Sequence, residues 1–161
     1  MISFADMAAH FRRSAERCEA GLELVVVQTT AGARERAAAM IGHDQPGWRD
    51  LSPATLYGFV HPLAGWIPGK ITLGYASEAE HRPLERTGAL ARSIEGTAEG
   101  LLGVIGSADP VALYQEMGTP NARYPIPPRP FLATGLRDEM PQMEVRCGEL
   151  ALSLLVPPGA R

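Results

Sequence analysis

The chain has 161 residues, of which 45% are hydrophobic and 20% are charged, a composition that suits one packed domain and excludes a disordered tail. Its formal net charge of -3 excludes the basic excess that a dedicated DNA-binding domain usually carries. Charged side chains interrupt the N-terminal apolar stretch, and no apolar run reaches the roughly 18 residues that span a membrane. We therefore expect neither a secretory signal nor a membrane anchor, and synthesis in the cytoplasm of the producing cell.

The N-terminal segment 4–40 predicts one long helix that ends at Gly42, because apolar residues recur along it at helical spacing. At 1.5 Å per residue it would be about 55 Å long, more than a domain of this size can bury along its whole length. One face is therefore expected to meet solvent or a neighbouring subunit. Gly21, Gly32 and the β-branched run 25–27 are the places where this helix could kink or break.

Residues 43–83 form an irregular stretch that is rich in glycine and proline and contains Trp48 and Trp66. Within it, residues 70–75 alternate like a short strand. Irregular segments of this length are uncommon in compact domains and are often functional. The stretch is either an insertion that reaches toward a partner or a loop that wraps the core with its tryptophans, and the pattern favours neither.

The middle of the chain predicts a strand pair followed by a helix. Residues 91–97 and 101–107 are expected to form two short strands joined by a turn that contains glycine. Asp109 is placed to cap the next helix, Pro110 suits its first position, and Gly118 ends it.

A C-terminal helix is predicted from Phe131 onward, and Pro141 either kinks it or begins a second helix. Its apolar residues fall on one stripe, which consists of Leu132, Leu136, Met140, Met143, Cys147, Leu150 and Leu154. The expected fold is therefore a single α+β domain over residues 1–161, with an irregular insertion at about 43–83. A small antiparallel sheet is flanked by a long N-terminal helix, a short middle helix and a C-terminal helix.

The segment 114–132 is the most informative, because its chemistry suits contact rather than catalysis. Three of the four residues in 127–130 are prolines, which makes an extended and rigid arm. Such an arm can position one subunit against another. Phe131 could alternatively be a core residue. The candidate subunit-interface or arm residues are Tyr114, Glu116, Gly118, Thr119, Pro128, Arg129, Pro130 and Phe131.

Glu116 lies one turn before the end of its helix, where a negative charge opposes the helix dipole. Something is therefore expected to compensate it. Arg129 is the obvious candidate, either from the same chain or across a subunit boundary. The alternative is a solvated carboxylate with no partner.

A search for catalytic chemistry finds no constellation. The four histidines and two cysteines show no metal-ligand spacing, and Cys18 and Cys147 are interpreted as reduced core thiols. Ser93 has no candidate base beside it in the sequence. We therefore expect no catalytic residue, no bound metal, no cofactor and no enzymatic activity.

Several short motifs occur in a fixed order, and together they resemble the signature of tailed-bacteriophage neck and tail-completion proteins. A Trp-x-x-Leu-Ser element around Trp48 resembles the related virion-morphogenesis branch. The others are Thr87-Gly88-Ala89-Leu90-Ala91-Arg92-Ser93-Ile94, a strand at 104–107, Tyr114-Gln115-Glu116-Met117-Gly118-Thr119 and Pro128-Arg129-Pro130-Phe131. The family-motif residues to which the resemblance gives a structural role are Trp48, Thr87, Gly88, Leu90, Ser93 and Ile94.

The resemblance implies a homo-oligomeric ring in the mature neck, commonly a hexamer, which completes or terminates the tail and joins it to the head connector. The implied partners are copies of the chain itself, neighbouring neck or connector proteins, and tail-tube or sheath proteins. DNA would pass through the lumen without specific binding, and no membrane is involved. The expected location is the virion, after assembly in the host cytoplasm. A head-side connector or stopper subunit and a non-virion intracellular binding module remain alternatives.

Overall fold

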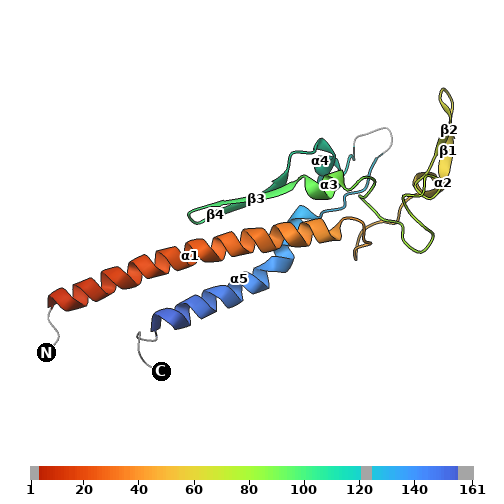
Figure 1. The fold of residues 1–161 in the computed structure, drawn as a ribbon. Helices are drawn as coiled ribbons and strands as arrows, with labels where there is room; N and C mark the ends of the chain where they lie inside the picture. Colours follow the sequence, from red (N-terminus) through yellow and green to blue (C-terminus); the bar gives the residue numbers. More distant parts are fainter. Residues whose placement is uncertain (1–3, 121–124, 156–161) are drawn as a thin grey trace.

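The computed structural model describes residues 4–120 and 125–155 and has an α+β fold (Figure 1). The long N-terminal helix, the short middle helix and the C-terminal helix are all confirmed. The β structure differs from the expected single sheet, because it forms two separate two-stranded antiparallel sheets. The elements in chain order are α1 Phe4–Met40, α2 Pro53–Tyr57, β1 Gly58–His61, β2 Gly65–Pro68, α3 Ala89–Arg92, β3 Ile94–Glu99, β4 Leu102–Ser107, α4 Pro110–Met117 and α5 Leu132–Leu155.

Helices α1 and α5 lie side by side and run in opposite directions, and α1 extends past the end of α5 (Figure 1). Neither Gly21 nor Gly32 breaks α1. Both glycines are instead points of close approach, because a Cβ atom at Gly21 would overlap Leu150 and one at Gly32 would overlap the Glu139 carboxylate. The absence of a side chain lets the two helices pack at short range.

The hairpin β3–β4 lies along α1 as well, in a register that pairs Ile94 with Ser107 and Glu99 with Leu102. The predicted first strand began too early, because residues 89–92 form the short helix α3 before the strand starts. Gly88 adopts the left-handed conformation at φ 72° and introduces this turn. Local hydrogen bonds therefore override the strand propensity of residues 91–93.

The hydrophobic core gathers where the C-terminal end of α1 meets α3, β3, α4 and the start of α5. Phe131 has no exposed surface and Ile94 only 1%, and both pack in a cluster with short and branched apolar side chains. Trp48 and Leu84 cover the cluster from the outside. The remaining buried members are Ala37, Met40, Ile41, Leu90 and Ala112.

The insertion contains α2 and the hairpin β1–β2, which stands clear of α1 and α5 (Figure 1). The strand predicted at 70–75 is wrong, because this segment forms successive turns closed by hydrogen bonds such as that from Tyr75 N to Lys70 O at 2.8 Å. The two tryptophans have different surroundings. Trp48 packs on the core, whereas Trp66 lies on the hairpin and is 57% exposed.

Helix α5 continues through Pro141 without ending, so no second helix begins there. Its buried face is rotated from the predicted apolar stripe. Leu136 and Met140 are exposed, whereas Gly135 and Glu139 are buried against α1. The reason is that the glycine permits close contact with α1 and the carboxylate is neutralised there, as described below.

Candidate functional site

The carboxylate of Glu116 caps the N-terminus of α5. Its Oε2 accepts hydrogen bonds from the backbone N–H groups of Phe131 at 2.8 Å and Leu132 at 2.9 Å, and its Oε1 accepts one from Ala133 at 2.9 Å. The first N–H groups of a helix have no partner within it, and they carry the positive end of its dipole. Glu116 is therefore compensated by another helix rather than by Arg129.

Replacing Glu116 with glutamine is expected to lower the free energy of unfolding by about 1 kcal/mol, because hydrogen bonds to a charged group are worth more than those to a neutral amide. Urea unfolding measures the change, and amide hydrogen exchange at 131–133 locates it. The control is Glu149→Gln, at an exposed position on α5. Equal stability of the two variants would contradict the capping role.

Gly118 and Thr119 hold the returning proline arm. The Thr119 N–H donates to Ile126 O at 2.9 Å, and Thr119 Oγ1 accepts from the Ile126 N–H at 2.8 Å. Gly118 has φ 71°, and a Cβ atom there would lie 2.7 Å from Ile126 O and 2.9 Å from Pro128 N. Only glycine allows the arm to pass so close.

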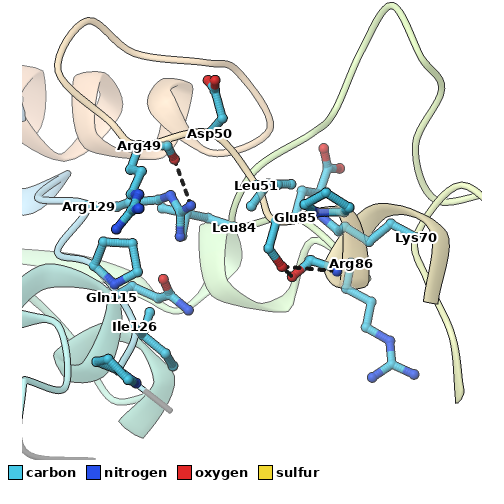
Figure 2. A pocket seen from close by; sticks show the side chains of 15 residues that line it. Arg49, Asp50, Leu51, Lys70, Leu84, Glu85, Arg86, Gln115, Ile126 and Arg129 are labelled. Carbon is cyan, nitrogen blue, oxygen red and sulfur yellow. Dashed lines mark hydrogen bonds between the residues drawn. The ribbon is translucent and has the colours of Figure 1, made fainter. Parts of the chain in front are cut away.

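Arg129 joins the arm to two other segments of the same chain. Its backbone N–H donates to Gln115 O at 2.6 Å, and its Nη2 donates to Arg49 O at 2.8 Å (Figure 2). The residue is only 6% exposed. Burial lowers the pKa of the Arg129 guanidinium, and the charge of Asp44 opposes that shift.

The structure brings most of the arm candidates together into one corner between α4 and α5, which consists of Glu116, Gly118, Thr119, Arg129 and Phe131. Pro130 belongs to the corner through its carbonyl, which accepts from Thr134 Oγ1 at 3.0 Å. Tyr114 and Pro128 are exposed instead, and Tyr114 shows 53% of its surface. In this chain the corner is held by intramolecular bonds, which leaves Tyr114 and Pro128 as the candidates accessible to another subunit.

The motif residues 87–94 build the turn that enters β3. Leu90 and Ile94 are core residues. Ser93 Oγ lies 2.8 Å from Leu90 O and 2.7 Å from Ser107 Oγ, and Ser107 Oγ also accepts the Asp109 N–H at 3.1 Å. These bonds tie α3, β4 and the start of α4 together. The exposed Thr87 contributes its carbonyl, which accepts from Arg92 Nη2 at 3.1 Å.

A buried acid that the sequence did not suggest lies between α1 and α5. Glu139 is 2% exposed, and its carboxylate accepts hydrogen bonds from Arg36 Nε at 2.6 Å and Arg146 Nη1 at 2.7 Å. Burial alone would raise the pKa of Glu139, but the hydrogen bonds and charges of both arginines outweigh it and lower the pKa. The available signal was Gly32, whose missing side chain makes room for this carboxylate.

Acid is expected to remove the stability that Glu139 contributes. Because its folded-state pKa lies below the ordinary value of 4.5, this stability is present above that pH and is lost as the pH falls through the folded pKa. Urea unfolding at pH 7 and pH 3 should show a smaller acid-induced loss for Glu139→Gln than for the wild type. Glu144→Gln, on an exposed position of α5, is the control and should keep the wild-type loss. An unchanged pH dependence in Glu139→Gln would contradict the assignment.

The molecule exposes more surface than its mass requires. The accessible area is 11389 Å², whereas a compact monomer of 17.3 kDa exposes about 7,800 Å². Large apolar side chains contribute at both ends. On α1, Phe4 is 90% and Phe11 65% exposed, and at the β1–β2 hairpin, Leu63 is 94% and Val60 72% exposed. We call these the α1 patch (Phe4, Met7, Phe11) and the hairpin patch (Phe59, Val60, Leu63, Trp66).

Two further searches of the described residues found nothing. No helix in that part of the chain has both the length and the apolar character to cross a lipid bilayer. Within 4–120 and 125–155, no three His, Cys, Asp or Glu side chains cluster as a set of metal ligands would.

Comparison with known proteins leaves the motifs as the sole basis of the family resemblance. No protein-family model, curated protein or solved structure matches this chain.

Proposed function

We propose that this chain is a structural, non-catalytic subunit of the neck of a tailed bacteriophage. Copies of it form a closed ring, a hexamer in the simplest case, which completes or terminates the tail and joins it to the head connector. The ring would contact neighbouring connector and tail proteins in the virion, and DNA would pass through its lumen without specific binding. The observation that carries the proposal is the excess of accessible surface, with apolar patches at two separate places.

The position of the two patches favours a ring over a symmetric dimer. The α1 patch lies at one end of the molecule and the hairpin patch at the other (Figure 1). When two different patches of one chain pair with each other, each copy leaves one patch free for the next, and the series closes if the rotation between copies allows it. Contiguous apolar surface of this kind marks interaction sites in soluble proteins.

The test is assembly of the purified chain, followed by its presence in particles. Mass photometry and negative-stain electron microscopy should show closed rings, and purified phage particles should contain the protein at the neck. A chain that stays monomeric on its own and is absent from particles would contradict the proposal and favour a binding module outside the virion. A ring found on the head side of the neck would identify a connector or stopper subunit instead.

Replacing Phe11 with aspartate is expected to shift the assembled chain toward monomers by at least about tenfold in concentration, because a charge cannot be buried in an apolar contact without a partner. Sedimentation velocity over a concentration series measures the shift. Ala8→Asp places the same charge on an exposed position of α1 while removing only a methyl group, and it should have a smaller effect. Thermal unfolding of both variants as monomers should match the wild type, since Phe11 lies outside the core.

A further inference from the structure

A cleft of about 730 Å³ lies beside the α4–α5 corner, between the insertion, the loop at 84–86 and the proline arm (Figure 2). Its lining is more positive than the chain as a whole, which has a net charge of -3. Four basic residues line it, against two acidic ones. The basic residues are Arg49, Lys70, Arg86 and Arg129, and the acidic ones are Asp50 and Glu85.

The two acids do not cancel this charge. Glu85 already forms an ion pair with Arg82 at 3.2 Å, and Arg82 is not part of the lining. Arg86 contributes less than its charge suggests, because its guanidinium lies 5.7 Å from the centre of the Tyr75 ring. The cations that remain to face the cleft are Arg129 with Arg49 on one side and Lys70 on the other (Figure 2).

Arg129 has an unused hydrogen-bond donor in this cleft. The residue is 6% exposed, and its Nε–H is shielded from water and finds no acceptor among the described residues. A buried donor without a partner is costly, and such groups call for an explanation. Gln115 Oε1, on the same wall, also lacks a partner within the described part of the chain.

Lys70 is held where it feels the other positive charges. Its ammonium donates a hydrogen bond to Arg82 O. Burial lowers the pKa of Lys70 and the charges of Arg82 and Arg129 lower it further, whereas the charge of Glu85 raises it. An anion between Arg129 and Lys70 would relieve this repulsion and supply the acceptor that the Arg129 Nε–H lacks.

We propose that this cleft binds an oxyanion, a phosphate or a carboxylate group, between Arg129 and Lys70. The planar guanidinium supplies several N–H donors in a fixed arrangement that matches both groups, and the ammonium supplies a second positive charge. The group could belong to a free anion or to a side chain of another protein. The chemistry of recognition is the same for both sources.

Isothermal titration calorimetry of the full chain tests the proposal. Sodium phosphate and sodium acetate are titrated separately at pH 7, with the ionic strength held constant by sodium chloride. Saturable binding of at least one anion is expected. Stronger binding of phosphate would indicate a free or phosphoryl anion as the natural source, and stronger binding of acetate would indicate a protein carboxylate.

Variants of the two cations locate the binding. Lys70→Gln and Arg129→Lys should each weaken it by at least about tenfold, since a charged hydrogen bond is lost or misplaced. Arg13→Gln removes an exposed positive charge on α1 and should leave it unchanged. Circular dichroism checks that each variant is folded; because Lys70 lies outside the core cluster, Lys70→Gln keeps the test valid if Arg129→Lys unfolds the chain. The proposal is overturned if the wild type binds neither anion saturably, or if Lys70→Gln binds as the wild type does.

Discussion

The variant Phe131→Ala is expected to lose about 3–5 kcal/mol of unfolding free energy, the largest single loss anticipated for this chain. Phe131 has no exposed surface and packs in the core with Leu90, Ile94 and Ala112. Removing the ring forfeits its transfer free energy and leaves a cavity that the backbone can only partly close.

The matched control is Phe11→Ala, the same chemical change at a side chain that is 65% exposed. This variant should stay within about 0.5 kcal/mol of the wild type when both are measured as monomers. Urea unfolding followed by circular dichroism gives both values. If the two variants lose similar stability, Phe131 is not the centre of the core, and its role would have to be sought in contacts between subunits.

A second large effect is expected from Gly135→Ala, which reverses the usual outcome of this substitution. In a helix interior, alanine is normally more favourable than glycine by about 1 kcal/mol. At Gly135, however, the new Cβ atom would lie 2.7 Å from Ala37 N and 2.9 Å from Ala33 O. Both are backbone atoms, so α1 and α5 would have to separate, at a cost of about 1–3 kcal/mol.

Gly148 on the same helix provides the comparison. A Cβ atom there meets no heavy atom within 4 Å, so Gly148→Ala should stabilise the chain by roughly 0.5–1 kcal/mol. Thermal and urea unfolding of the two variants should therefore show changes of opposite sign. Stabilisation by both would mean that α1 and α5 are not in close contact at Gly135.

The helices were the predictable part of the fold, because their signals are local. Asp109 accepts from the Val111 N–H at 2.9 Å, as expected of a cap, and the long apolar period of α1 needed no tertiary information. The hairpin β1–β2 was missed for a physical reason. Several of its apolar side chains, including Val60 and Trp66, face solvent, so its strands lack the alternation that burial imposes.

The candidate site was predictable only as far as chemistry could be inferred without geometry. The helix dipole indicated that Glu116 needs compensation, but the donors come from the backbone of α5, which carries no sequence signature. Glu139 was hidden because its neutralising partners lie 103 and 7 positions away, on Arg36 and Arg146. Spacing along one helix cannot reveal which cations a second helix supplies.

The uneven burial of α1 has a consequence for how this protein can change over time. All of its buried residues lie between Val25 and Met40, so its first turns add nothing to the interior. Substitutions among those turns can alter which neighbours the molecule accepts while leaving its folding intact. Selection for a new binding partner and selection against unfolding therefore act on different stretches of one continuous rod, and the first can proceed quickly while the second holds the remainder constant.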